Sequence, residues 1–277
     1  MTALICMILD HIAVFIPDMP VQLRWIGRLA APVFMFCLCE GVDHTSSEKK
    51  YLLRLYAGSL IMALIQIRTG ISANIFRTLF VIAVFCVMIK NIRKGKKEYK
   101  AYLILFCLYQ LITMLVFGYF YIQNRSVLIR RLYSAIAGSI AFCEGGLPYV
   151  LMGILIYLLR NDKKKLVIGF SLYTAVYAIL SLTDITTAIT EPLIAMTSDP
   201  DHYRNIVKVG FFMIANAFRP GVTGRDPFTE SYQWMMIMSL IPVYFYNGEK
   251  GRSVKWFFYA FYVIHLLGLW KIGGLLS

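Results

Sequence analysis

Long apolar runs, separated by short polar segments, make up most of the chain. Eight runs resemble membrane-crossing helices, and a further region at 127–159 is apolar but broken by Glu144-Gly145-Gly146 and Pro148. A helix needs about 17–25 residues to cross a bilayer, a length that most of these runs approach. Helices are expected throughout, because unpaired backbone groups are too costly in lipid. The eight runs span 2–16, 25–42, 51–67, 75–90, 101–121, 166–182, 232–246 and 254–272.

The charged loops between these runs predict how the chain crosses the membrane. Basic residues form four clusters, whereas the stretch at 184–201 is acidic. Lysine and arginine favour the cytoplasmic side, so the basic clusters are placed inside and the acidic stretch outside. Region 127–159 then crosses once as a broken span, or three times, and 185–217 crosses an even number of times, zero included. The basic clusters are Lys49–Lys50–Arg54, Arg93–Lys100, Arg160–Lys165 and Lys250–Lys255.

The pattern predicts an all-α, polytopic transmembrane helical bundle of about 9–11 spans, with residues 1–277 forming a single domain. Composition agrees, because 59% of the residues are hydrophobic and only 16% are charged. Soluble domains average roughly 45–50% apolar and about 25% charged residues. We expect a multi-pass protein of the plasma (inner) membrane with a cytoplasmic N-terminus.

The charge balance and the motif content exclude several other classes. Lys and Arg number 28 against 15 Asp and Glu, a net charge of +13. In a soluble chain this excess would suggest nucleic acid. Here the basic residues lie mostly between apolar runs, which indicates a topology signal and contact with anionic lipid headgroups, and no nucleic-acid partner. The six cysteines lie in apolar runs without a C-x-x-C pair, so no metal site is expected, and soluble-enzyme motifs such as Walker A are absent.

Ionisable residues inside apolar runs are the strongest candidates for chemistry. Each costs about 2.5–3.5 kcal/mol at the centre of the membrane, so each needs a reason. At about 1.5 Å per residue, His11 lies near mid-depth in the first span, directly after Asp10, and His265 lies at a matching depth in the last. The two histidines can meet in one cavity, where a neutral imidazole accepts a proton from a nucleophile. The alternative is a buried histidine satisfied by an interhelical hydrogen bond.

Further charged residues lie at the ends of the early spans. Arg28 enters the second span on its outer half, where it can hold a carbonyl, a carboxylate or Asp10, or extend to the interface. Glu40 lies at the inner end of that span and is either functional or a solvated helix end. The cluster of Lys49, Lys50 and Arg54 either binds the phosphates of a cytosolic cofactor or serves topology alone.

The order and spacing of several short pieces resemble the TraX family of integral membrane proteins. The resemblance covers the first ~80 residues and a C-terminal part, whereas about 100–230 is similar only in hydropathy. The matching pieces are Asp10-His11-Ile12, Leu23 to Phe34, Glu40-Gly41, His44-Thr45, Lys49 to Leu55, Asn74 to Leu79, Tyr246-Asn247-Gly248 and Phe257 to Leu267.

This resemblance implies a chemistry. The family is associated with N-terminal acetylation of conjugative pilin and is similar to multi-pass acyltransferases, including the lysosomal heparan glucosaminide N-acetyltransferase and the acyltransferase-3 enzymes. Those enzymes use cytosolic acetyl-CoA, modify a group on the far side and rely on a membrane-embedded histidine. By resemblance, His11 is the catalytic base, with Asp10 and Arg28 orienting it or stabilising charge. The residues expected to bind acetyl-CoA are His44, Lys49, Lys50, Arg54, Asn74 and Arg77, and those expected beside the substrate or in support are Glu40, Tyr262 and His265.

The function expected first is a membrane-embedded acyltransferase that moves an acetyl group from acetyl-CoA to an amine or hydroxyl at the outer side. The acceptor stays open between a pilin-like peptide N-terminus, a glycan and a lipid. The alternative is an ion- or proton-coupled transporter, with which the break at Glu144-Gly145-Gly146 is compatible because discontinuous helices often build transport sites. A non-catalytic assembly factor is a third possibility.

Overall fold

The computed structural model describes residues 1–72, 74–123, 125–141, 143–183, 185, 188, 224–249 and 255–276. Within these ranges all regular structure is helical, and no strand occurs. Six helices are long and apolar enough to cross a membrane, and two shorter apolar helices accompany them. The prediction of an all-α polytopic bundle is confirmed. The crossings expected within 185–217, together with the acidic residues Asp184, Glu191, Asp199 and Asp201, lie outside the described residues, apart from positions 185 and 188 of that segment.

Sequence signals set several helix boundaries. The Ser47 side chain accepts a hydrogen bond from the backbone of Lys50 and caps α4, and Gly70 ends that helix in the left-handed conformation. Asp162 caps α9 by accepting from the backbone N–H groups of Lys164 and Lys165. The elements are α1 Thr2–Phe15, α2 Gln22–Gly27, α3 Ala30–His44, α4 Glu48–Thr69, α5 Ile75–Arg93, α6 Glu98–Ile122, α7 Val127–Ile136, α8 Gly146–Leu159, α9 Lys163–Leu182, the 3-10 helix η2 Tyr232–Ser239, α12 Leu240–Tyr244 and α13 Lys255–Leu276.

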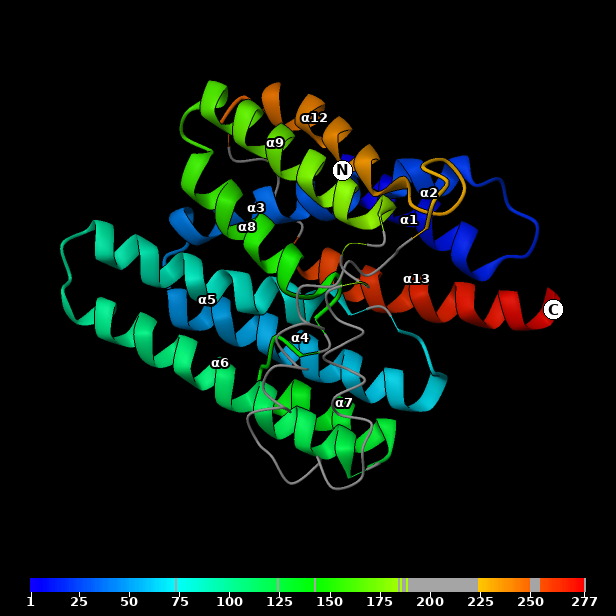
Figure 1. The fold of residues 1–277 in the computed structure, drawn as a ribbon, viewed down its shortest axis with the longest axis horizontal. Helices are drawn as coiled ribbons and strands as arrows, with labels where there is room; N and C mark the ends of the chain where they lie inside the picture. Colours follow the sequence, from blue (N-terminus) through cyan, green and yellow to red (C-terminus); the bar gives the residue numbers. More distant parts are fainter. Residues whose placement is uncertain are drawn as a thin grey trace.

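Three connections gather at one end of the bundle, on the left in Figure 1. They join α3 to α4, α5 to α6 and α8 to α9, and they carry the basic residues of 44–50, 90–100 and 160–165. We call this the basic end. Ion pairs tie its segments together, since Lys90 binds Glu48 at 2.9 Å. The connections from α4 to α5 and from α6 to α7 lie at the opposite end, as the alternation of spans predicts.

The broken region at 127–159 contains two short helices, and neither is among the six that are long enough to cross a membrane. Its first helix, α7, has 10 residues and is therefore about 15 Å long, half of the ~30 Å hydrocarbon layer. Helix α7 packs on α4, where Arg131 donates to the Gln66 carbonyl at 3.1 Å near the opposite end and the Tyr56 hydroxyl donates to the Ile136 carbonyl at 2.7 Å nearer the middle. Helix α8 then runs from Gly146 towards the basic end. Of the two alternatives for this region, the structure favours a single broken span.

The run at 232–246 is not one continuous α-helix. It begins as the 3-10 helix η2, and α12 starts anew at Leu240. Pro242 accounts for the change, because proline in a helix interior removes a hydrogen bond and clashes with the preceding turn, whereas in the first turn no donor is needed. The restart at Leu240 places Pro242 in that first turn. The tighter helix rises about 2.0 Å per residue, so η2 covers about 16 Å.

Helices α3, α5 and α8 supply the centre of the core. Their completely buried side chains include Met35 and Val42 on α3, Val81 and Ile82 on α5, and Met152 on α8. Many residues of α6, by contrast, face outwards, as expected of a helix with one side against lipid. The buried ionisable side chains therefore lie inside a packed helical body, where each needs a polar partner.

Candidate active site

His11 and His265 lie in contact, although 254 residues separate them. Helix α1 carries His11, which is 7% exposed, and α13 carries His265. His11 Nδ1 and His265 Nε2 are 2.7 Å apart. The ring centroids are 5.0 Å apart and the ring planes meet at 18°, so the imidazoles join edge to edge in almost one plane. A face-to-face stack cannot bring two ring nitrogens so close. The contact is therefore an in-plane hydrogen bond.

Asp10 lies between two guanidinium groups. Its Oδ1 atom is 2.6 Å from Arg28 Nη2 and 3.2 Å from Arg24 Nη1. Arg24 Nε also donates to the Tyr232 hydroxyl at 3.0 Å, which links α2 to η2. Of the alternatives left open for Arg28, the structure shows the pairing with Asp10, and the Arg28 side chain is only 12% exposed. One carboxylate thus orients two arginines.

Gly27 allows this arrangement. A Cβ atom at this position would overlap the Asp10 side chain. Helices α1 and α2 can therefore approach closely enough for Asp10 to reach both guanidinium groups, because the residue facing it has no side chain.

A cavity of about 50 Å³ lies beside these pairs. It has room for a group of a few heavy atoms. Residues of α1, α2, α3, α5, α8 and α13 line its wall, together with Arg28 after α2 and Glu144 shortly before α8. Among the residues that line it are Asp10, His11, Arg28, Glu144, Tyr149 and Tyr262. Candidate base, cation and acid groups thus border one small space.

The cavity lies closer to the end opposite the basic end than the mid-depth expected from sequence. Ile75, the first residue of α5, lines it, and its backbone N–H donates to the Tyr262 hydroxyl at 3.2 Å. Helix α5 runs from there to Arg93 at the basic end, a rise of about 27 Å. The expectation counted His11 from an N-terminus at the inner face. In the structure the N-terminus lies near Cys37, in the middle of α3, so α1 starts part-way along the bundle.

The residues predicted to bind acetyl-CoA fall into two groups. His44, Lys49 and Lys50 are exposed at the basic end. Arg54 lies one turn further along α4, with its guanidinium 5.7 Å from the Tyr51 ring centre. Within the described part of the chain no carboxylate pairs with Lys49, Lys50 or Arg54, and Arg54 Nε is buried without a hydrogen-bond partner.

Asn74 and Arg77 form the second group, at the other end of the bundle. Both are buried. The Asn74 amide donates to the Ser59 carbonyl at 3.2 Å and to Gln66 Oε1 at 3.4 Å, which ties the start of α5 to α4. The six residues predicted to bind acetyl-CoA therefore do not gather at one place. Helices α4 and α5 form an antiparallel pair, so 49–54 and 74–77 lie at opposite ends.

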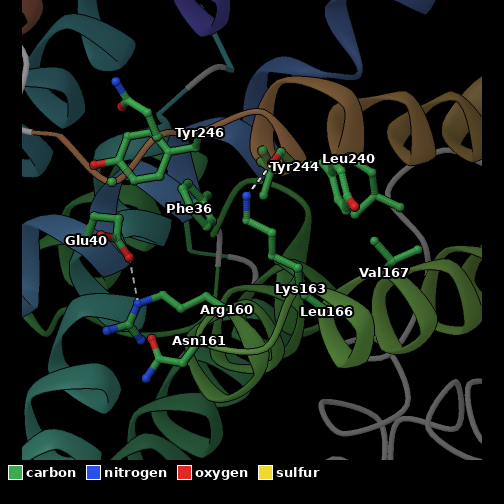
Figure 2. A pocket seen from close by; sticks show the side chains of 13 residues that line it. Phe36, Glu40, Arg160, Asn161, Lys163, Leu166, Val167, Leu240, Tyr244 and Tyr246 are labelled. Atoms are coloured by element: carbon green, nitrogen blue, oxygen red, sulfur yellow. Dashed lines mark hydrogen bonds and ion pairs between the residues drawn. The ribbon is translucent and has the colours of Figure 1, made fainter.

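Glu40 belongs to a separate network at the basic end. Its carboxylate accepts from Arg160 Nε at 2.9 Å, and Arg160 also pairs with Asp43. Figure 2 shows Glu40 and Arg160 facing each other at a cavity of about 330 Å³, with Lys163 donating to the Tyr244 carbonyl. This cavity and the one beside His11 share no lining residue. They lie on opposite faces of α3, so Glu40 does not reach the histidines.

A model of the TraX family, described as TraX protein, matches residues 1–273. The chain belongs to the TraX family. The match includes the middle of the chain, about 100–230, where the resemblance seen in the sequence was in hydropathy only. No curated protein and no solved structure matches.

The TraX-family fold adds residues to the site that the sequence did not single out. Glu144 was read only as part of a helix break, yet it lines the cavity and accepts from the Asn74 backbone at 3.1 Å. Tyr149 joins it from the first turn of α8. Arg24 and Tyr232 extend the Asp10 pair towards η2. The signal was present for Glu144, because an acidic residue in an apolar region needs a polar partner.

Proposed function

We propose that this TraX-family protein is a membrane-embedded acyltransferase, which moves an acetyl group from acetyl-CoA to an acceptor amine or hydroxyl. One observation carries the proposal, namely the His11–His265 pair and the Asp10–Arg28 pair on the wall of one cavity inside an apolar bundle. A base and a cation at such a place are the groups that acyl transfer requires. TraX-family membership supports the same chemistry.

His11 acts as the general base in this proposal. It takes the proton of the acceptor N–H or O–H as the acceptor attacks the thioester carbonyl carbon. The new C–N or C–O bond forms, the C–S bond breaks, and His11 returns the proton to the leaving sulfur. The close packing around His11 keeps bulk water from competing with the acceptor.

Arg28 stabilises the negative oxygen that attack creates. Asp10 holds its guanidinium in place before the reaction, so little reorganisation is needed as charge develops. Arg24 adds a second guanidinium group to the Asp10 carboxylate. Glu144, on the same wall, offers a carboxylate to a positively charged acceptor amine.

Lys49, Lys50 and Arg54 are the groups suited to the phosphates of the acyl donor. They lack carboxylate partners in the described part of the chain, and the buried Arg54 Nε atom has a hydrogen bond still to make. Tyr51 and Tyr259 lie beside Arg54, and Tyr262 follows one turn later on α13 towards the histidines. We place the acyl donor along these side chains, with its phosphates at the basic end and its thioester towards His11.

The basic end faces the cytoplasm in this proposal, by the positive-inside rule. The protein is then a multi-pass protein of the inner membrane with its N-terminus on the cytoplasmic side. The cavity lies nearer the outer face, where an acceptor such as a peptide N-terminus, a glycan or a lipid headgroup is supplied.

Acetyl transfer by the purified protein in lipid nanodiscs tests the proposal. With labelled acetyl-CoA and a panel of peptide, glycan and lipid acceptors, we expect transfer by the wild type and a loss of about 10²–10⁴-fold in His11→Asn. Cys107→Ala changes an exposed residue of α6 and is the control expected to match the wild type. Equal transfer by His11→Asn and wild type would contradict the catalytic role. Proton flux in proteoliposomes without any acyl donor would favour the transporter instead.

The donor site has its own test. Replacing Lys49 and Lys50 together by glutamine should raise the KM for acetyl-CoA by roughly 2–5-fold per residue, the range of exposed ion pairs, with kcat unchanged. High salt should reproduce the effect in the wild type because it screens exposed charges. A lowered kcat at unchanged KM would place the donor phosphates elsewhere.

A further inference from the structure

Three groups on α13 and α1 form a hydrogen-bonded chain that ends at the cavity. His265 Nδ1 lies 2.8 Å from the Phe261 carbonyl oxygen, one turn earlier on α13. His265 Nε2 lies 2.7 Å from His11 Nδ1. His11 lines the cavity, and no described residue hydrogen-bonds its remaining ring nitrogen, Nε2. The chain therefore runs from a backbone carbonyl through two imidazoles to one nitrogen without a protein partner.

The first member of this chain determines the positions of the protons. A carbonyl oxygen can only accept a hydrogen bond, so His265 Nδ1 must carry a proton. In a neutral His265 ring, Nε2 is then the acceptor. His11 Nδ1 must consequently be the donor across the 2.7 Å contact, which leaves the lone pair of a neutral His11 on Nε2. With the opposite proton placement, the lone pair of His265 Nδ1 would face that of the Phe261 oxygen at 2.8 Å.

Packing holds both rings in these orientations. Phe261 stacks on His265 with ring centroids 5.1 Å apart and planes at 10°. Phe15 and Tyr262 meet the His11 ring edge to face, each with centroids 6.3 Å apart. The in-plane contact between the imidazoles is therefore supported on several sides, and a ring rotation would break both hydrogen bonds and this packing.

We propose that His265 is a positioning residue that keeps the proton of His11 on Nδ1 and so presents His11 Nε2 to the cavity as the basic atom. The catalytic meaning of this placement rests on the proposed acyl transfer, whereas the placement itself does not. When His11 accepts a proton at Nε2, it becomes an imidazolium whose Nδ1–H still donates to His265. The carboxylate partner familiar from other histidine bases is thus replaced by a second imidazole anchored on a backbone carbonyl.

Nitrogen NMR of the histidine rings tests the proton placement directly. The full-length protein, with ¹⁵N-labelled histidine and reconstituted in lipid bilayers, contains four histidines, so the signals can be assigned by substitution. At a pH where both rings are neutral, we expect Nδ1–H on His265 and Nδ1–H with bare Nε2 on His11. A wild-type His11 with its proton on Nε2 would overturn the proposal without any variant.

Two variants of nearly equal side-chain length sharpen the test. Glutamine at 265 can accept from His11 through its oxygen and donate to the Phe261 carbonyl through its nitrogen, whereas methionine of similar size can do neither well. We expect His265→Gln to keep Nδ1–H on His11 and His265→Met to shift the proton towards Nε2. An unchanged His11 tautomer in His265→Met would contradict the proposal.

Activity separates the positioning role from a structural one. In the acetyl-transfer assay, His265→Met should lower kcat by about 10²-fold or more at unchanged KM for acetyl-CoA, and His265→Gln should restore most of it. If the rings carry their protons as stated but no form of the protein transfers acetyl, the proposed function fails and the placement stands. If the wild type transfers acetyl but its neutral His11 carries the ring proton on Nε2, the proposed proton placement fails and the proposed function stands.

Discussion

Two arginine–carboxylate clusters lie in different parts of the bundle with opposite stoichiometry. Beside the histidines, one carboxylate of Asp10 holds the two guanidiniums of Arg24 and Arg28. At the basic end, one guanidinium of Arg160 holds the two carboxylates of Glu40 and Asp43. The first cluster places two guanidinium groups on one carboxylate next to a small cavity, whereas the second places two carboxylates on one guanidinium and ties the end of α3 to the end of α8. In the proposed function, the same pair chemistry therefore serves the reaction in one place and assembly in the other.

The surroundings of the clusters reinforce this difference. Tyr157 donates to Asp43 at 2.9 Å, and its ring centre lies 4.2 Å from the Arg160 guanidinium carbon, so the basic-end cluster has partners on several sides. Arg28 borders a cavity with His11 and Glu144. A charge enclosed by partners favours the fold, whereas a charge that borders free space is suited to bind a ligand or a transition state.

The largest expected effect concerns stability at the basic end. Arg160→Met leaves Glu40 and Asp43 without their shared cation, and because Arg160 is buried but both carboxylates are partly exposed, the loss costs about 2 kcal/mol. Thermal unfolding in detergent should show a clear loss of stability. Lys165→Met, which removes an exposed partner of Asp162 in the same region, is the control and should change little. Equal stability of the two variants would mean that the Arg160 cluster does not hold the helix ends.

Arg28→Met is the matching change beside the histidines. Arg24 still pairs with Asp10, so unfolding should be affected much less than in Arg160→Met. Acetyl transfer should fall by about 10²–10³-fold in kcat, the cost of removing one oxyanion donor. Measured side by side, the two variants separate activity from stability. If Arg28→Met lost stability and kept its activity per folded molecule, the assigned roles would be reversed.

Gly27→Ala gives a smaller effect on the same cluster. The added methyl group overlaps Asp10, which must move away from Arg24 and Arg28. Overpacking of this kind costs about 1–3 kcal/mol. We expect a modest loss of stability and a reduced kcat, measured by unfolding and acetyl transfer. Gly268→Ala on α13, where the added Cβ atom would meet no atom of another described segment within 4 Å, should leave both quantities unchanged.

The smallest effect is a pH dependence at the start of α9. The Lys165 backbone N–H and ammonium group, together with the Lys164 N–H, lower the pKa of Asp162. A carboxylate with a lowered pKa stabilises the fold above its unfolded pKa, and this contribution is lost as the pH falls through the folded value. The protection of the amides in the first turn of α9, measured as exchange relative to the intrinsic rate at each pH, should therefore fall at acidic pH. Asp162→Asn should show low protection with a weaker pH dependence.

Much of the architecture could be predicted from sequence. Runs of apolar residues indicate helices in lipid because of composition alone, and the interruption at Glu144-Gly145-Gly146 was visible as a break. The run at 232–246 was predicted as a simple span, because hydropathy does not distinguish an α-helix from a 3-10 helix followed by a new start at Pro242.

The candidate site could be predicted in part. Asp10, His11, Arg28 and His265 were singled out because each places an ionisable group in an apolar run, and the structure brings all four to one region. Glu40 was expected beside the substrate or in support, yet its side chain pairs with Arg160 at the basic end. The sequence shows which polar residues are costly to place in lipid. It does not show which neighbouring side chain supplies their hydrogen bond or opposite charge.

The sequence by itself determined that this chain is an all-helical membrane protein of the TraX family, with its basic loops at one end and rare ionisable residues inside. These properties depend on local composition and on the cost of polar groups in lipid. Only the tertiary structure decided that His265 meets His11, that Asp10 holds two arginines and that Glu40 pairs with Arg160. Such contacts depend on how helices far apart in the chain pack together, which no local pattern records.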